Sequence, residues 1–165
     1  MKKALIAGLV LSLTIYFLSF NDTTSYKDGD VIFQTTAGET GKAIQLATHS
    51  KYNHCGVLFF ENNEWIVYEA VQPVKKTTLK EFNARGKGTV KRLSNKVLST
   101  EDITKLKAQF KKYEHKNYDE AFNWSDDQIY CSELVYKLYN NALNIVLCKP
   151  RKVSDFDLSN PLVKE

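Results

Sequence analysis

The segment Tyr130-Cys131-Ser132-Glu133-Leu134 carries the residue best suited to chemistry, a cysteine at the predicted start of a helix. Backbone N–H groups at a helix start lack intrahelical partners, and the helix dipole favours a negative group there. Such a position lowers the pKa of a thiol, and the thiolate is the reactive form. The same N–H groups can bind the oxyanion of a tetrahedral intermediate. A buried structural cysteine is the alternative interpretation, because free cysteine is among the most buried residue types.

A cysteine nucleophile needs a base and a group that orients this base, and the chain has three histidines. His115 lies among lysines at a predicted solvated helix end, and His49 ends another predicted helix. His54 begins an apolar strand and is the predicted base. Glu69 lies inside a second apolar strand, where an acid must be paired, so we expect it to orient His54 from the neighbouring strand. The alternative for Glu69 is an edge-strand acid that points to water.

Other reaction types find little support in the sequence. There is no Cys-x-x-Cys, no His-x-x-x-His and no dense acidic loop, so no metal site is predicted. Ser132 lacks the Gly-x-Ser-x-Gly setting of a serine hydrolase. The net charge of +4 is mild and no basic stripe with spaced aromatics occurs, so nucleic-acid binding is not expected.

The first 20 residues are predicted to be a signal peptide or an N-terminal membrane anchor. Met1-Lys2-Lys3 precedes residues 4–20, a run without a charged residue, which is typical of a secretory signal. No clear small-x-small cleavage site follows, so an uncleaved anchor, with membrane association through residues 4–20, is the alternative. Lys2 and Lys3 should stay in the cytoplasm in either case. The sequence therefore predicts an exported protein, in the periplasm or cell envelope.

The remaining chain is expected to form a polar tether over residues 21–28 and one domain over residues 29–165. The chain has 165 residues, 43% of them hydrophobic, and can bury a core. Strands are predicted at 31–34, 54–60, 65–71 and 88–93, and helices at 39–49, 78–83, 100–113 and 129–142. The second and third strands predict a hairpin, and Asp126-Asp127 are the predicted caps of the last helix. The expected fold class is α+β, with a small antiparallel sheet packed against helices.

Three cysteines are an odd number for an exported protein, so at least one should remain unpaired. Cys55 and Cys148 could form a disulfide that leaves Cys131 free. Whether their geometry allows this bond is left open by the sequence.

Five segments follow one another in a family-specific order: Gly29-Asp30-Val31-Ile32-Phe33, Asn53-His54-Cys55-Gly56-Val57, Tyr68-Glu69-Ala70-Val71, Tyr118-Asp119-x-x-Phe122 and Tyr130-Cys131-Ser132-Glu133-Leu134-Val135. This pattern resembles the YiiX/YebB-like branch of the NlpC/P60 superfamily, which comprises circularly permuted papain-like cysteine hydrolases. In that branch the histidine strand precedes the cysteine helix, as it does here. Cys55 is a departure, because similar proteins usually carry an aliphatic residue after the histidine.

The resemblance implies a permuted papain-like fold in which Cys131 is the nucleophile, His54 the base and Glu69 the acidic third member. It implies no cofactor. It also implies a substrate pocket, for which the candidates are Tyr118, Tyr130, Asp30 and Gln34.

The implied reaction is acyl transfer to water through a thioester, and three functions stay open. The first is an amidase or peptidase that acts on cell-wall peptides or acyl-amino acids, which export and the resemblance favour. The second is a lipid-directed thiol acyltransferase or esterase, because permuted relatives include lipid-processing enzymes. The third is a catalytically silent binding module of the envelope, against which the intact Cys131, His54 and Glu69 count.

Overall fold

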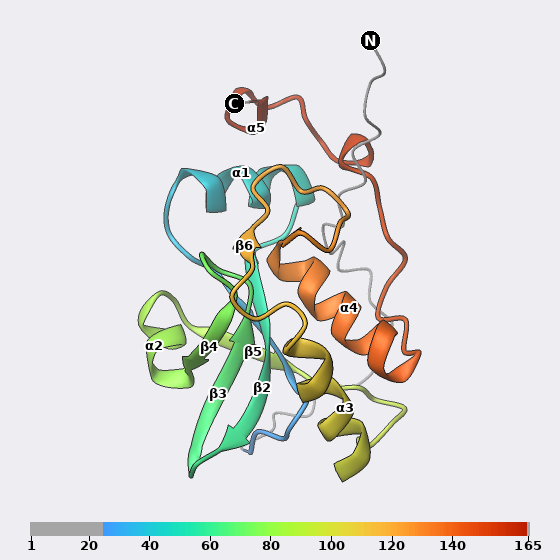
Figure 1. Cartoon of the computed structure of the whole chain (residues 1–165). Helices are drawn as coiled ribbons and strands as arrows, with labels where there is room; N and C mark the ends of the chain where they lie inside the picture. Colours follow the sequence, from blue (N-terminus) through green and yellow to red (C-terminus); the bar gives the residue numbers. More distant parts are fainter. Residues whose placement is uncertain (1–24, 165) are drawn as a thin grey trace.

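A five-stranded antiparallel sheet forms the centre of the protein, of which a computed structural model describes residues 25–164 (Figure 1). Its strands are β1 (Val31–Gln34), β2 (His54–Glu61), β3 (Glu64–Glu69), β4 (Lys75–Thr78) and β5 (Gly88–Lys91). They lie in the order β4-β3-β2-β1-β5, with every neighbouring pair antiparallel. The predicted hairpin of β2 and β3 is confirmed, and Asn62 and Asn63 adopt the left-handed conformation that a tight hairpin turn requires.

The edge strand β4 was not predicted from the sequence. Its Lys-Lys-Thr-Thr sequence lacks the apolar alternation of the other strands, since Lys75 and Lys76 are exposed and Thr77 is buried. Lysines are common on edge strands because they discourage pairing with other chains. The strand therefore depends on pairing with β3, which propensity alone does not reveal.

Helices cover both faces of the sheet, and a second, two-stranded sheet lies beside them (Figure 1). The helices are α1 (Glu39–Thr48), α2 (Leu79–Ala84), α3 (Thr100–Phe110), α4 (Cys131–Leu143), a 3-10 turn (Val153–Asp155) and α5 (Pro161–Lys164). Thr78 and Glu81 form a capping box at the start of α2, and Ser99 and Asp102 form one at the start of α3. These boxes satisfy N–H groups that have no intrahelical partner.

Helix α4 begins at Cys131, two residues later than predicted, and Asp126-Asp127 are not its caps. The small parallel pair of β6 (Asn117–Tyr118) and β7 (Gln128–Ile129) holds the chain extended as far as Ile129, so the helix cannot start earlier. Asp126 instead accepts a hydrogen bond from Lys137 at 2.7 Å. The two β-bridges thus determine that Cys131 is the first helical residue.

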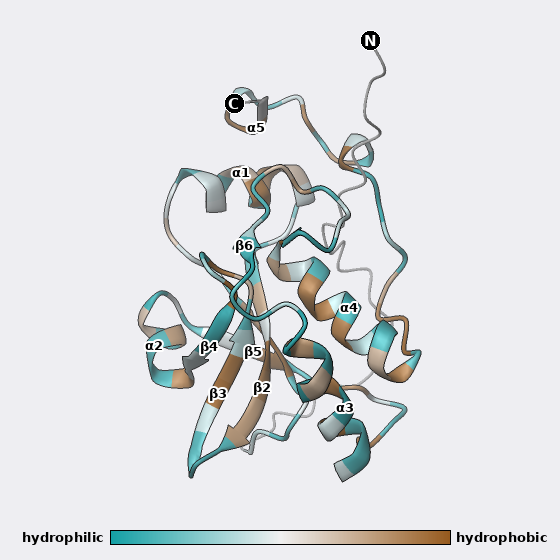
Figure 2. Ribbon diagram, viewed as in Figure 1, coloured by the Kyte–Doolittle hydropathy of each residue, from teal (hydrophilic) through white to brown (hydrophobic). Residues whose placement is uncertain are grey.

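The core has two layers, one on each side of the sheet. The larger layer lies between the sheet and helices α3 and α4, where Tyr68 packs between Phe59 and Phe110 at ring distances of 4.5 and 4.3 Å. Fully burying one such side chain stabilises the fold by about 1.5–3 kcal/mol. Figure 2 shows this apolar character along β2, β3 and the sheet-facing side of α4. The smaller layer, under α2, consists of Ile32, Leu58, Val67 and Phe82.

The predicted signal or anchor at residues 1–20 and the first half of the predicted tether, residues 21–24, lie outside the described residues. Within residues 25–164, no helix is both long and apolar enough to span a membrane.

Candidate active site

Three elements bring the predicted reactive residues together. His54 is the first residue of β2, Glu69 is the last of β3, and Cys131 is the first of α4. Because β2 and β3 are antiparallel, the first residue of β2 and the last residue of β3 lie at the same end of the two strands. Glu69 pairs directly with Gly56, so His54 lies two residues further along the same face and is a diagonal neighbour of Glu69.

Gly56 makes room for this diagonal contact. A Cβ at this position would lie 2.5 Å from Val67 Cγ1, 2.9 Å from the Tyr68 carbonyl oxygen and 3.3 Å from Glu69 Cβ. Any side chain at position 56 would therefore force the end of β3 to shift. The absence of one leaves the Glu69 carboxylate free to reach the His54 ring.

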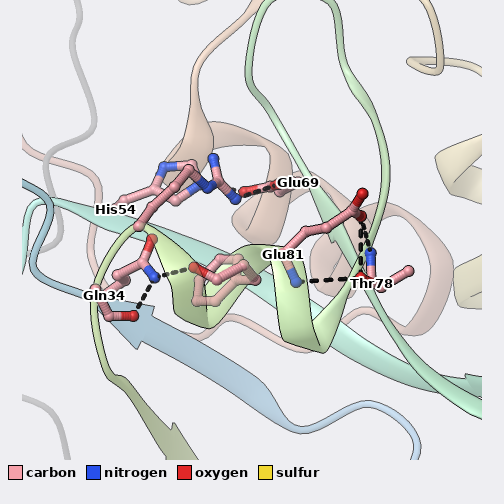
Figure 3. A network of polar contacts seen from close by, with 8 residues as sticks. Gln34, His54, Glu69, Thr78 and Glu81 are labelled. Carbon is pink, nitrogen blue, oxygen red and sulfur yellow. Dashed lines mark hydrogen bonds and ion pairs between the residues drawn. The ribbon is translucent and has the colours of Figure 1, made fainter.

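Glu69 is fully buried and shares its two carboxylate oxygens between two nitrogen groups (Figure 3). Oε2 lies 2.5 Å from His54 Nε2, and Oε1 accepts from Arg85 Nη2 at 2.5 Å. Burial pushes the pKa of Glu69 up, but the hydrogen bond and charge of His54, with the charge of Arg85, hold it below its usual value. The edge-strand alternative, in which Glu69 points to water, does not apply.

The His54 ring lies between Glu69 and Cys131. Its Nε2 faces Glu69, which leaves the Nδ1 side for the hydrogen bond with the Cys131 side chain. Burial alone would lower the pKa of His54, but hydrogen bonds with Cys131 and Glu69 and their negative charges raise it to about 9. His54 is therefore an imidazolium near neutral pH, and it faces a sulfur.

Cys131 carries the matching negative charge. A hydrogen bond from the Cys55 thiol, together with the hydrogen bond and charge of His54, lowers the pKa of Cys131 well below its usual value, against the effect of burial. Its backbone lies at the start of α4, where the helix dipole also favours an anion. The side chain is only 6% exposed, yet it lines a cavity, so the residue is more than a structural core cysteine.

Tyr118, at the end of β6, contacts the same sulfur. Its hydroxyl hydrogen-bonds the Cys131 side chain and accepts from the Cys131 backbone N–H. Burial and the negative charge of Cys131 raise the pKa of Tyr118, so the hydroxyl keeps its proton. Gln72 Oε1 accepts from the Tyr118 backbone N–H at 2.7 Å and fixes this strand beside the site. The resemblance implied Tyr118 as a pocket residue, and the structure places it at Cys131.

Two hollows meet at His54. A small cavity of about 40 Å³ extends from Cys131 between β1, α1 and Phe122, and its apolar lining includes Phe33, Ile44 and Tyr52. A larger cleft of about 610 Å³ opens on the other side of His54. This cleft is lined by residues 36–41, Ile44, Asn53, His54, residues 70–72, Arg85, Tyr118 and Glu120. A chain bound across the site would therefore meet a small, almost wholly apolar hollow and a larger cleft that also carries polar and charged side chains.

Gln34 lies beside His54 on the neighbouring strand and holds the residues that pack against the His54 ring. It pairs with His54 across β1 and β2, and its side-chain amide donates to the carbonyl oxygens of Phe82, at 2.5 Å, and Gly86 (Figure 3). The Phe82 ring stacks on the His54 ring at 5.8 Å. Gln34 lines neither hollow, so its place is behind the histidine and not in the predicted substrate pocket.

Two other predicted pocket residues lie away from the substrate side. Asp30 binds Arg92 through both carboxylate oxygens, at 2.6 and 2.7 Å, and lines a hollow at the opposite end of β1. Tyr130 is fully buried, packs against Phe122 at 5.2 Å and lines neither hollow beside Cys131. Both were pocket candidates implied by the resemblance, but the length of β1 separates Asp30 from the site, and Tyr130, the residue before α4, points into the core.

Two further residues of the site, Arg85 and Cys55, were not predicted from the sequence. Arg85 follows α2 and reaches back to Glu69, and no local pattern in the sequence links residues 16 positions apart in this way. Cys55 is a free thiol, as are Cys131 and Cys148, so the Cys55–Cys148 disulfide considered from the sequence is not formed. Within residues 25–164, no group of three or more His, Cys, Asp or Glu side chains is placed to hold a metal ion.

The order of elements and the site define a permuted papain-like hydrolase fold, in which the histidine strand precedes the cysteine helix. The chain belongs to the family described as permuted papain-like amidase enzyme, YaeF/YiiX, C92 family, which matches residues 25–165. The resemblance to YiiX-like proteins and the predicted α+β, permuted papain-like fold class are thereby confirmed.

Two similar proteins come from Escherichia coli. The protein YiiX of strain K12 is 44% identical over 159 residues, which cover 94% of this chain and 77% of that protein. A crystal structure from strain O157:H7, described as the metalloprotein yiiX, has 48% sequence identity and a TM-score of 0.79. That match covers 84% of this chain and 78% of the solved one.

Proposed function

We propose that this protein is a cysteine amidase or peptidase that hydrolyses an amide bond in a peptide or acyl-amino acid. The observation that carries the proposal is the position of His54, which hydrogen-bonds Glu69 on one side and Cys131 on the other. Membership of a papain-like amidase family supports the same reaction class. The predicted export signal at residues 1–20 favours a substrate derived from the cell wall.

In the proposed reaction, the Cys131 thiolate attacks the amide carbonyl carbon. The imidazolium of His54 then donates its proton to the leaving nitrogen, and a thioester remains on Cys131. Neutral His54 next accepts a proton from water, which attacks the thioester and releases the acid. Glu69 holds the ring with Nδ1 toward the sulfur and stabilises each imidazolium that forms.

The oxyanion of each tetrahedral intermediate would lie at the start of α4. The Cys131 backbone N–H points toward the Tyr118 hydroxyl in the present structure. A substrate carbonyl oxygen that enters there could accept from both this N–H and the Tyr118 O–H. Two such donors stabilise the developing negative charge more in the transition state than in the ground state.

The size of the apolar cavity favours amides of small acyl groups over lipids. A volume of about 40 Å³ corresponds to roughly three water molecules, by the usual 10–15 Å³ for each. A long acyl chain would not fit in this cavity without rearrangement of α1, and the wider cleft at His54 carries the charged side chains Glu39, Arg85 and Glu120. Because of this size limit, we rank a lipid-directed acyltransferase or esterase second. A silent binding module is the third candidate function.

The first test measures alkylation of each cysteine by mass spectrometry as a function of pH, in the full chain. We expect Cys131 to label rapidly at mildly acidic pH and to lose this reactivity in His54→Ala. Cys148, whose pKa burial raises, is the internal control and should label only in alkali. Labelling of Cys131 that follows an ordinary thiol near pH 8.5, unchanged by His54→Ala, would contradict the proposal.

The second test measures hydrolysis of short acyl-amino acid amides and cell-wall peptides by the wild type and Cys131→Ala. We expect the variant to lose activity, while the matched variant Cys148→Ala keeps it. Cleavage of long-chain acyl esters in preference to these amides would favour the lipid-directed enzyme. A reactive thiolate without turnover of either substrate class would favour the binding module.

A further inference from the structure

Cys55 places a second thiol against the predicted nucleophile. It follows His54 in β2, and because side chains alternate along a strand, it lies on the opposite face, toward α4. Cys55 and Cys131 belong to the same buried cluster and line the same small cavity. Their side chains are hydrogen-bonded to each other, with the Cys55 thiol as the donor to the Cys131 sulfur. Two thiols that interact beside one small cavity can join in a disulfide once one of them is oxidised.

The location of this pair also decides which thiol an oxidant meets first. The cavity of about 40 Å³ admits molecules of the size of water, and it leads to both sulfurs. Only Cys131 is held in the thiolate form, through His54 and the start of α4, and thiolates are the form that peroxides oxidise. Cys55 is only 3% exposed and neutral while Cys131 is charged.

We propose that Cys55 is a resolving thiol for Cys131, so that oxidation of the site by hydrogen peroxide ends in a reversible Cys55–Cys131 disulfide. In the first step the Cys131 thiolate attacks one peroxide oxygen, the O–O bond breaks and hydroxide leaves. Cys131 becomes a sulfenic acid, and the peroxide is reduced by two electrons. In the second step the Cys55 sulfur attacks the Cys131 sulfur, the S–O bond breaks and, with the Cys55 proton, water leaves.

The charge of Cys131 and the pKa of Cys55 determine the order of these two steps. The hydrogen bond to Cys131, burial and the negative charge of Cys131 raise the pKa of Cys55, so Cys55 stays protonated while the nucleophile is charged. A neutral sulfenic acid at Cys131 removes the charge that raises this pKa. Cys55 is then the only thiol of the pair that can still ionise. Cys55 is thus inert in the active site and becomes a nucleophile after Cys131 is oxidised.

The disulfide would block turnover and protect Cys131 from irreversible oxidation. Further oxidation of a sulfenic acid gives sulfinic and sulfonic acids, which dithiols do not reduce. A dithiol does reduce a disulfide through thiol–disulfide exchange. The departure from the aliphatic residue usual at position 55 in similar proteins therefore gives this chain a recoverable site.

The test treats the full chain with stoichiometric hydrogen peroxide, blocks the remaining thiols with an alkylating agent and maps the peptides without reduction. We expect the free thiols to fall from three to one, and Cys55 and Cys131 to appear in one cross-linked peptide. Dithiothreitol should restore all three thiols and the acid-pH labelling of Cys131. Cys148→Ser should behave like the wild type, because Cys148 takes no part in the proposed bond.

Cys55→Ala is the decisive variant, and its thermal unfolding and circular dichroism report whether it folds. When this variant and the wild type are both treated with an excess of hydrogen peroxide, which the second and third oxidations consume, we expect the Cys131 of the variant to accumulate sulfinic and sulfonic acid that dithiothreitol does not reverse. The proposal fails if the wild type shows the same irreversible oxidation, or if the cross-link contains Cys148. For a Cys55→Ala that does not fold, the wild-type peptide map decides alone. No substrate is used, so a negative result leaves the proposed hydrolysis unaffected.

Discussion

The end of β3 and the first turn of α4 each bury a glutamate completely, and they treat its charge in opposite ways. Glu69 has His54 and Arg85 at 2.5 Å, and these partners keep its pKa below the usual value despite burial. Glu133 lies 2.8 Å from Lys137, yet burial outweighs that partner and raises the pKa of Glu133 to about 7. The negative charge of Asp119 adds to this rise.

The opposite pKa shifts of Glu69 and Glu133 fit the charged groups near each glutamate. The imidazolium of His54 needs a fixed anion, and Glu69 supplies it. The start of α4 already holds the Cys131 thiolate, and a second full negative charge in the same turn would raise the free energy of that thiolate. A glutamate that is half protonated near neutral pH limits this repulsion. Burial thus yields an anion in one region and, in the other, an acid that is about half protonated near neutral pH, according to the partners present.

The largest expected effect comes from exchanging each carboxylate for its amide. Glu69→Gln should lower kcat/KM roughly 10³-fold, because an amide can favour the wrong ring tautomer and does not stabilise the imidazolium. Glu133→Gln, the matched control, should lower it less than about tenfold, since the acid there is already about half neutral near pH 7. Steady-state kinetics on the same amide substrate measures both. Equal losses in the two variants would remove the distinction between the two regions.

A smaller effect should appear in the pH dependence of stability. The pKa of Glu133 is about 7 in the folded chain against 4.5 as the ordinary value, so its stabilising contribution is complete below pH 4.5 and is lost as the pH rises through 7. At about 1.4 kcal/mol for each pKa unit, the loss between pH 5 and pH 7 is about 2 kcal/mol. His54, with a pKa raised from 6.5 to about 9, loses its contribution mainly at higher pH.

Urea unfolding of the wild type and Glu133→Gln at pH 5, 6 and 7 tests this prediction. The free energy of unfolding of the wild type should fall relative to that of the variant as the pH rises. A constant difference between the two proteins would show that Glu133 titrates at its ordinary pKa in the fold.

An effect smaller than those of Glu69→Gln and of the Glu133 titration is expected at Arg85, which is 37% exposed. Arg85→Met removes one partner of Glu69 Oε1, but water can replace it, so kcat/KM should fall only about tenfold. The acid limb of the pH–rate profile should also move to higher pH, because the pKa of Glu69 rises without the guanidinium. Arg85→Lys should recover part of both changes. An unchanged profile in Arg85→Met would mean that His54 alone fixes the charge of Glu69.

Much of the fold follows from local patterns in the sequence, since β1 and the β2–β3 hairpin consist of β-branched and aromatic runs with clear turn residues between them. Strand β4 could not be found in this way, because its polar sequence becomes a strand only by pairing with β3. The start of α4 was misplaced for a similar reason, as it depends on the bridge between Tyr118 and Ile129.

Cys131, His54 and Glu69 were accessible from the sequence because chemically suitable residues are scarce in this chain and the family order supported them. The contacts between them required the sheet register and the packing of α4. Asp30, which directly precedes β1, and Glu69, the last residue of β3, illustrate the limit: both bind an arginine, but the register places only Glu69 beside His54. The linear sequence does not show which end of a strand lies beside His54.

The bare Cα of Gly56 has a consequence for how the protein tolerates mutation. Substitution to alanine changes neither charge nor hydrogen-bonding capacity, yet the added methyl group meets the backbone of Tyr68 and the base of the Glu69 side chain. In a scan of all single substitutions scored by activity, position 56 should be as intolerant as the three reactive residues, although glycine contributes no functional group. Gene variants that inactivate this protein are then expected at a residue with no reactive side chain.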